Sequence, residues 1–82
     1  VRAAVCQALG RSRDKRAVAP LVKRVQDDSW KVRRAAVKAL GRFDGEAVVS
    51  ALTAAVKDPS APVRKAALKA LSRVKVRARS GL

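Results

Sequence analysis

The side chains of this sequence that can do chemistry are mostly cationic, and they recur at regular positions. Three rows of cations align along the chain: Arg34 with Lys65, Lys38 with Lys69, and Arg11 with Arg42 and Arg73. Guanidinium and ammonium groups donate charge-assisted hydrogen bonds to carboxylates and phosphates. Positions four residues apart lie along one line of a helix. The rows therefore predict a grid of seven cations on one surface, facing an anionic partner.

The overall charge indicates the same class of partner. The 82 residues include 20 Lys and Arg against 6 Asp and Glu, so the formal net charge is +14. Such an excess attracts nucleic acid, an acidic protein face or an anionic membrane surface. The competing interpretation is a solvated surface, because exposed helix positions favour Lys and Arg by propensity alone. Glu has a similar propensity but occurs only at position 46, which favours a binding role.

Catalytic residue types are scarce. The sequence has no His and a single Cys, so neither a His-based triad nor a zinc cluster can be assembled. Cys6 is predicted to be a small packing residue rather than a nucleophile. Residues 41–45 are predicted to form a turn between helices rather than a phosphate-binding loop. We therefore expect a non-enzymatic protein with no cofactor, no metal and no small-molecule substrate.

Two features of the sequence bear on where the protein works. No apolar run approaches the roughly 20 residues that a membrane span needs, so we expect no membrane partner. A lone Cys cannot form an internal disulfide, which favours a reducing compartment. We expect an intracellular, cytoplasmic protein. Because Val1 stands in the middle of a repeat, we also expect the chain to be a fragment of a longer one.

A 31-residue repeat organises the chain. Residues 1–11 align with residues 32–42 and with residues 63–73, and residues 18–27 align with residues 49–58. A period of this length is typical of stacked helical repeats. Each unit is predicted to form two antiparallel helices.

The apolar spacing predicts where these helices lie. In residues 32–43 one face holds a core stripe, opposite the cations; it consists of Val32, Ala36, Ala39, Leu40 and Phe43. The other helix is predicted over about 15–26 and again over about 46–57. Because Pro breaks an interior helical turn but is tolerated in the first one, Pro20 predicts a short turn over 15–19 and a regular helix from residue 20.

Helix ends are predicted from capping residues. Asp14 or Asp44 can cap the start of the second helix of a unit, and Ser29 or Ser60 the start of the first. Glycines are expected at helix ends, namely Gly10, Gly41 and Gly45.

Three features together resemble the HEAT-repeat family, in particular its 31-residue branch found in phycobilisome-lyase-type proteins. They are Pro20 in one helix, Asp27 or Asp58 in the turn, and the Val-Arg pair that opens the next helix. The resemblance implies an all-α fold, a right-handed α-solenoid (an α-α superhelix) of about five helices. It also implies that the Pro-containing helices lie outside and the Val-Arg helices line the concave face.

The resemblance extends to about Val74. We expect a HEAT-like repeat array over residues 1–74, about two and a half repeats, and a basic tail over residues 75–82 that is disordered until bound. Ala51 stands where the first unit has Pro20, so a weaker kink is expected there. The two end faces of the array should contact more of the chain, another copy or a partner.

In the HEAT family, Asp and Arg residues of this type hydrogen-bond along the stack. The resemblance therefore implies a structural ladder rather than ligand contacts for Asp27, Arg33, Asp58 and Arg64, and likewise for Arg2. A carboxylate bonded to a guanidinium is a charge-assisted pair, so we expect it to tie each turn to its neighbour.

Two functions fit the remaining cations. The first is a protein-binding scaffold whose basic concave face takes an acidic protein surface. The second is nucleic-acid binding through phosphates, in which Trp30 would be the one exposed aromatic able to stack on a base. Trp30 can equally cover the seam between repeats, the alternative we favour. A third idea, help with bilin attachment, depends on the family resemblance alone. Scaffolding leads because it is the commonest use of such a fold.

Overall fold

The structure is a computed structural model that describes the backbone of residues 2–12 and 14–80 and the side chains of residues 4–12 and 14–74. These residues form five α-helices and one 3-10 helix, with no strand among them. In chain order they are α1 (Arg2–Ser12), the 3-10 helix η1 (Lys15–Ala17), α2 (Val18–Arg24), α3 (Trp30–Leu40), α4 (Glu46–Ala55) and α5 (Ala61–Ser80).

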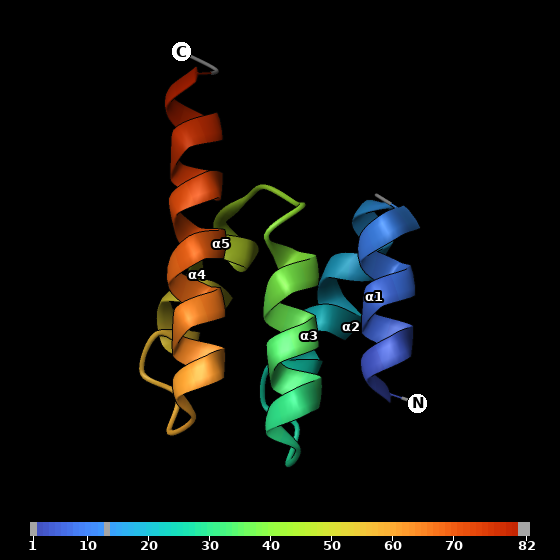
Figure 1. The fold of residues 1–82 in the computed structure, drawn as a ribbon. Coiled ribbons are helices and arrows are strands. Elements are labelled where there is room, and N and C mark those ends of the chain that lie inside the picture. Colours follow the sequence, from blue (N-terminus) through green and yellow to red (C-terminus); the bar gives the residue numbers. More distant parts are fainter. Residues whose placement is uncertain (1, 13, 81–82) are drawn as a thin grey trace.

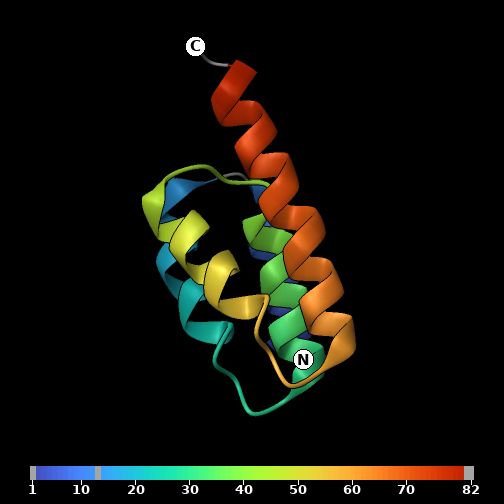
Figure 2. The ribbon, with the colours of Figure 1, turned by 90° about the vertical axis from the view of Figure 1, so that its left-hand side faces the viewer.

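The helices form two layers. Helices α1, α3 and α5 stand side by side, and each packs against the next (Figure 1). Helices α2 and α4 form the second layer, which is seen beside the first, to its left, when the molecule is turned by 90° (Figure 2). The predicted alternation between two layers along the chain, starting and ending in the same layer, is therefore confirmed.

The core lies between the two layers. The five residues of the predicted core stripe in α3 and its end are all buried, and Leu40 is completely so. From the second layer, Leu21 of α2 and Leu52 of α4 are also completely buried. Small and branched apolar residues thus fill the space between layers, as the spacing predicts.

Pro20 is accommodated near the start of its helix. Residues Lys15–Ala17 form a 3-10 turn, and α2 begins at Val18, so that Pro20 is its third residue. The predicted short turn followed by a regular helix is confirmed, with the helix starting two residues earlier than expected. Pro costs little there because the first turn of a helix has no intrahelical partner for its amides. The side chain of Asp14 accepts from the amide of Arg16 at 2.9 Å and so caps this turn, as predicted.

Two of the predicted caps are wrong. Ser29 occupies the N-cap position of α3, but its hydroxyl bonds to no amide of the helix. The carboxylate of Asp27 instead accepts from the amide of Ser29 at 2.9 Å, which shapes the turn before the helix. At the start of α4 the N-cap is Gly45 rather than Asp44. Its φ of 117° lies in the region that favours glycine.

Gly10 was expected at a helix end but lies inside α1. A Cβ atom built on Gly10 would lie 2.8 Å from the Cβ of Ala39 in α3. One repeat later, a Cβ on Gly41 would lie 3.0 Å from the Cβ of Ala70 in α5. The close approach of neighbouring helices therefore favours glycine at both positions. At Gly41 the predicted helix end is also confirmed, because Gly41 is the C-cap of α3.

The expected end of the last helix near Val74 is also wrong. Helix α5 continues to Ser80, and its last turns project beyond the other helices of its layer (Figure 1). Residues 75–80 contain only Lys, Val, Arg, Ala and Ser, and the Lys, Arg and Ala among them are strong helix formers. Without a Gly or Pro before position 81, nothing in the sequence ends the helix earlier.

Candidate functional site

A shallow groove runs over the exposed side of α1, α3 and α5. Its volume is about 480 Å³. The residues along its floor are small, because they are the residues through which the three helices approach one another; they are Gly10, Ala35, Ala39, Gly41, Ala66 and Ala70. Five cations line the same groove, namely Arg11, Lys38, Arg42, Lys69 and Arg73. The close approach of the helices thus brings cations from three segments to one surface.

A second hollow adjoins the first. It measures about 400 Å³ and is lined by Arg34, Lys38, Lys65 and Lys69 with Ala61, Pro62 and Ala66. Each of the seven cations named from the sequence is exposed and lines at least one of the two hollows. We refer to these seven residues as the basic face: Arg11, Arg34, Lys38, Arg42, Lys65, Lys69 and Arg73.

The basic face gathers like charges around two hollows whose described lining is free of acids. The described residues that line either hollow include no Asp and no Glu. Lys38 follows Arg34 by one helical turn, and Lys69 follows Lys65 in the same way. Like charges at this spacing repel each other on a helix. The face therefore carries an electrostatic cost that a bound anion would relieve.

Trp30 lies outside the two hollows of the basic face. It is the first residue of α3, it is 40% exposed and it lines neither hollow. The ammonium of Lys31 lies 6.0 Å from the centre of its ring, a distance at which a cation is attracted to an aromatic face. Trp30 therefore does not line the groove, although Arg34 of the basic face follows it by one helical turn on α3.

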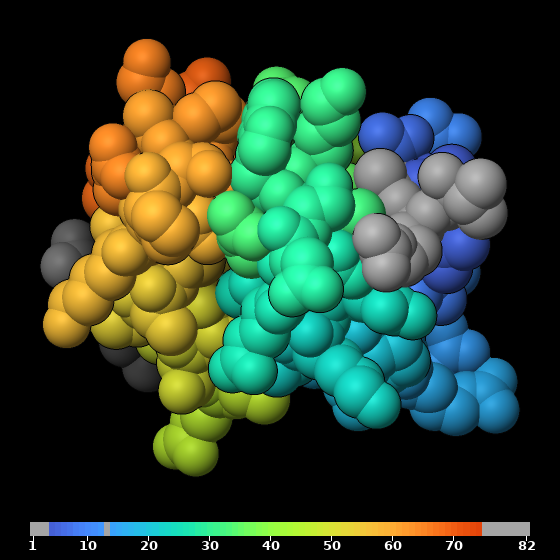
Figure 3. All heavy atoms as spheres, turned by 90° about the horizontal axis from the view of Figure 1, so that it is seen from below, coloured from blue at the N-terminus to red at the C-terminus, as the bar shows by residue number. Residues whose placement is uncertain are grey.

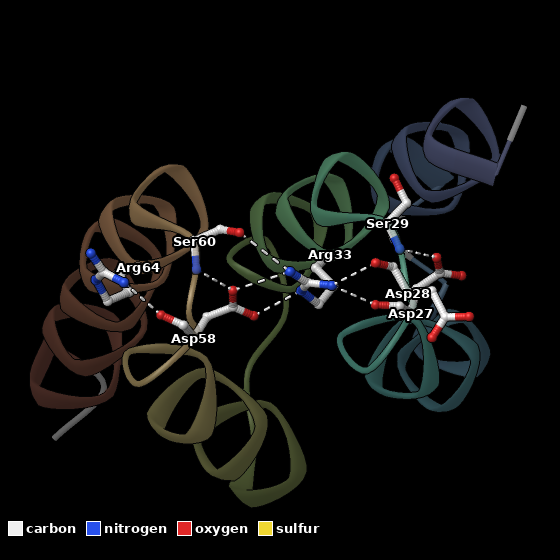
Figure 4. Close-up of polar contacts among 7 residues, drawn as sticks. All are labelled: Asp27, Asp28, Ser29, Arg33, Asp58, Ser60 and Arg64. Atoms are coloured by element: carbon white, nitrogen blue, oxygen red, sulfur yellow. Dashed lines mark hydrogen bonds and ion pairs between the residues drawn. The ribbon is translucent and has the colours of Figure 1, made fainter.

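Arg33 joins two successive turns of the stack (Figure 4). Its Nη1 donates to the carbonyl oxygens of Asp27 and Asp28, at 2.8 and 3.0 Å. Its Nε donates to Oδ2 of Asp58 at 2.9 Å, one repeat further on. The side chains of Arg33 and Asp58 are only 15% and 8% exposed. This pair therefore links the turn before α3 to the turn before α5. The two turns lie at the same end of the molecule, the end that faces the viewer in Figure 3.

The same pattern begins again at the next turn. Oδ1 of Asp58 accepts from the amide of Ser60 at 2.9 Å, as Asp27 does from Ser29. Nη1 of Arg64 donates to the carbonyl of Asp58 at 2.8 Å. The four residues proposed as a ladder thus lie along one line of contacts, while the side chain of Arg2 lies outside the described residues.

Some contacts of the ladder were missed by sequence reasoning. The Ser60 hydroxyl accepts from Nη2 of Arg33 at 3.4 Å. A guanidinium nitrogen of Arg24 lies 3.5 Å from Oδ2 of Asp27. The spacing of three residues between Arg24 and Asp27 would have predicted their ion pair. No local sequence signal predicts the bond between Arg33 and Ser60, because these residues stand 27 positions apart.

Other chemistry has little support in the described residues. Cys6 is free and completely buried in α1, and burial raises the pKa of its thiol. No three His, Cys, Asp or Glu side chains of the described part lie close enough together to hold a metal ion. No helix in the described residues is both long and apolar enough to cross a membrane.

Helix pairs repeated every 31 residues, stacked in two layers and joined turn to turn by Arg and Asp, define a helical solenoid. A family model of HEAT repeats matches residues 1–77, and the chain belongs to the HEAT-repeat family. Among curated proteins, the search found no match. HEAT repeats generally serve as protein-interaction scaffolds and are typically not enzymes. The narrower assignment to the phycobilisome-lyase-type branch stays a prediction.

Proposed function

We propose that this protein is a non-catalytic repeat scaffold that binds an acidic protein surface through its basic face. The observation that carries the proposal is the composition of the groove over α1, α3 and α5. Five cations line it, four from α1, α3 and α5 and one, Arg42, from the turn after α3, and its described lining holds no acid. Charge-assisted bonds to carboxylates would satisfy these groups and reduce the repulsion between them.

The spacing of the cations supports an acidic helix as one form of partner. Cations four residues apart on a helix are separated by about 6 Å along its axis. Carboxylates four residues apart on a partner helix have the same separation. The small residues along the groove leave room for such a helix to approach, because none of them extends beyond Cβ. Trp30 lies apart from the groove and would contribute only at the margin of the interface.

Nucleic-acid binding is the second candidate function, and the same excess of cations supports it. Proteins that hold single strands add aromatic platforms on which bases stack, whereas the described lining of the groove has no aromatic residue. Binding would therefore be limited to phosphates. We propose an intracellular setting for either function, since the single cysteine is free and buried.

Three polyanions tested at low and at raised salt concentration separate these functions. We expect poly-L-glutamate to bind at about 50 mM salt and to weaken steeply as salt is raised, because screening shortens the range of exposed charges. Duplex DNA and single-stranded RNA are not expected to bind at the same salt. If either bound with a log–log salt slope of several units, phosphate recognition would replace the proposed function.

A variant locates the binding surface. Replacing Arg34, Lys38, Lys65 and Lys69 together by Ala should abolish the binding of poly-L-glutamate. These side chains are exposed, so the circular dichroism spectrum and melting temperature should stay close to those of the unchanged protein. Undiminished binding by this variant would contradict the proposal.

A further inference from the structure

The seven cations of the basic face divide into two groups by residue type. The cations that line only the groove over α1, α3 and α5 are all arginines, namely Arg11, Arg42 and Arg73. The second hollow is surrounded by one arginine and three lysines, namely Arg34, Lys38, Lys65 and Lys69. We call this second hollow the lysine hollow. Lys38 and Lys69 also line the groove, so the two parts of the basic face are continuous.

The lysine hollow concentrates positive charge on two neighbouring helices. Its four cations come from α3 and α5, and the rest of its described lining is Ala61, Pro62 and Ala66. The side chains of Ala and Pro carry neither charge nor a hydrogen-bond acceptor. The described lining therefore contains nothing that neutralises the four cations, and an external anion would be bound by all of them.

The four cations stand at the corners of a small rectangle. The repeat sets Lys65 of α5 at the position of Arg34 in α3, and it sets Lys69 at the position of Lys38 in the same way. Along each helix the two cations are about 6 Å apart, and the axes of packed helices are about 8–10 Å apart. The centre of the rectangle then lies about 5–6 Å from each corner. Long side chains span this distance, so the four charged groups can converge on one compact anion.

A phosphomonoester suits this arrangement better than a carboxylate does. A phosphorylated Ser or Thr carries about −1.5 to −2 charges at pH 7 and three acceptor oxygens, whereas a carboxylate carries one charge on two oxygens in a plane. The guanidinium fork matches a planar pair of oxygens, but an ammonium is a compact point charge with three rotatable donors. Because three of the four cations are lysines, the charge of the ligand decides more than its plane.

We propose that the lysine hollow binds a phosphorylated side chain of the acidic protein partner, while the arginines of the groove bind its carboxylates. This inference rests on the proposed function, because it assigns two kinds of anionic group to the same basic face. Lys38 and Lys69 belong to both parts, so one segment of the partner can occupy both. A free phosphate ion or a lipid headgroup would fill the lysine hollow alone. A phosphodiester of nucleic acid carries only one charge per phosphate.

The spacing of the cations also specifies the motif on the partner. Arg73 follows Lys69 by four residues on α5, so it stands about 9 Å from the centre of the lysine hollow along the helix axis. A partner segment covers this distance in about six residues when it is helical and in about three when it is extended. The expected motif is therefore a phosphorylated residue with Glu or Asp three or six positions away.

Two synthetic peptides of equal net charge test the inference. One carries a central phosphoserine with Glu three and six residues to either side. In the other, two Glu residues replace the phosphoserine and one neutral neighbour. Titrated at about 50 mM salt and neutral pH, the phosphopeptide should bind at least about tenfold more tightly, which is the effect of one additional charge-assisted hydrogen bond.

Two double variants with equal loss of charge locate the preference. Arg34→Ala with Lys65→Ala changes only the lysine hollow, and Arg11→Ala with Arg73→Ala changes only the groove. All four side chains are exposed, so both variants should keep the circular dichroism spectrum and the melting temperature. The first variant should bind the two peptides about equally. The second should bind both more weakly and keep the preference for phosphate.

Acidification gives a readout that depends on the phosphate itself. The chain has no His, and the titratable groups that line the lysine hollow are Arg and Lys only. The second pKa of phosphoserine is about 6, whereas Glu stays ionised to about pH 4.3. The affinity for the phosphopeptide should therefore fall as pH is lowered through about 6, and the affinity for the Glu peptide should not.

The outcomes separate this inference from the proposed function. Equal affinities for the two peptides, or a preference that survives Arg34→Ala with Lys65→Ala, would overturn the inference and leave the proposed function standing. Failure of both peptides to bind would overturn both. Inorganic phosphate and vesicles that contain a phosphoinositide are tested as competitors. Either one displacing the phosphopeptide at concentrations near the Kd of that peptide would show that the phosphate has another source, and would overturn the inference.

Discussion

Replacing Arg33 by Ala is expected to weaken the fold far more than replacing Arg64, although the two stand at the same position of successive repeats. Arg33 donates to the carbonyls of Asp27 and Asp28 and to the carboxylate of Asp58. Arg64 donates only to the carbonyl of Asp58 among the described residues. The two substitutions therefore compare a contact that links two successive turns with a contact inside one turn.

The magnitude follows from the burial of the pair. A hydrogen bond to a charged group contributes about 1.5–3 kcal/mol, and removing one partner of a fully buried ion pair costs about 3–5 kcal/mol. Arg33 and Asp58 are 15% and 8% exposed, and Asp58 keeps its bond from the amide of Ser60. These contacts place the loss for Arg33→Ala at about 2 kcal/mol. The exposed Arg64 should cost about 0.5 kcal/mol.

Chemical denaturation measures this difference. In a domain of this size, a loss of about 2 kcal/mol corresponds to a fall of about 8–16 °C in melting temperature. Unfolding by urea is therefore measured at low temperature, where the variants are still folded before urea is added. A double-mutant cycle of Arg33→Ala with Asp58→Asn should give a coupling of at least about 1 kcal/mol.

A loss for Arg33→Ala no larger than that for Arg64→Ala would refute this reasoning. A coupling near zero with Asp58 would do the same, because it would mean that the observed contact contributes nothing to stability. Either result would leave helix packing alone as the source of the stack's stability.

Three further predictions concern other parts of the molecule. Gly10→Ala should destabilise by about 1–3 kcal/mol through overpacking against Ala39, despite the better helix propensity of Ala, and Ala39→Gly should restore part of the loss in urea unfolding. Cys6 should react with a thiol reagent far more slowly in the folded protein than in denaturant, since it is buried and its thiol pKa is raised; equal rates would contradict its burial. Hydrogen bonds from Arg16 lower the pKa of Asp14 in the folded state, so their contribution to stability is present above the ordinary carboxyl pKa and is lost as pH falls through the lowered one. The difference in unfolding free energy between the unchanged protein and Asp14→Asn should therefore shrink on acidification. A difference that grew would contradict a stabilising role of the ionised Asp14.

The helices and their alternation were predictable because the apolar spacing and the 31-residue repeat indicate the same helix positions in each unit. The core stripe ending in Leu40 and Phe43 is buried as expected. The position of Pro20 also limited where α2 can begin. Each of these features depends on neighbours in the sequence, or on a register that the repeat fixes.

The predictions for Gly10 and for the last helix were wrong for different reasons, whereas Gly41 and Gly45 do stand at helix ends. Gly10 resembles a helix end in sequence, but its role is set by the distance to Ala39 in another helix, which no local pattern reveals. The end of α5 was placed at Val74 because residues 75–82 do not resemble another outer helix. Their propensity for helix was sufficient to extend α5 to Ser80.

For the candidate site, the sequence predicted the identity of the cations but not the shape of the surface. Helical spacing placed Lys38 one turn after Arg34, and repeat spacing placed Lys69 beside Lys38. The groove between them depends on how closely the helices pack, which is a property of the small residues at their contacts. The sequence likewise did not show that Trp30 lines neither hollow, because it stands only one helical turn before Arg34 on α3.

The central claim is that the cations of the basic face, rather than positive charge in general, bind the acidic partner. Two triple variants with equal loss of charge test it most directly. One replaces Lys38, Lys65 and Lys69 by Ala, and the other replaces three exposed lysines away from the basic face, Lys15, Lys23 and Lys57. Titrated with poly-L-glutamate at about 50 mM salt, where the screening length exceeds about 10 Å, the first variant should lose most of its affinity and the second should retain it. Equal losses in the two variants would contradict the claim, because binding would then follow net charge and not the groove.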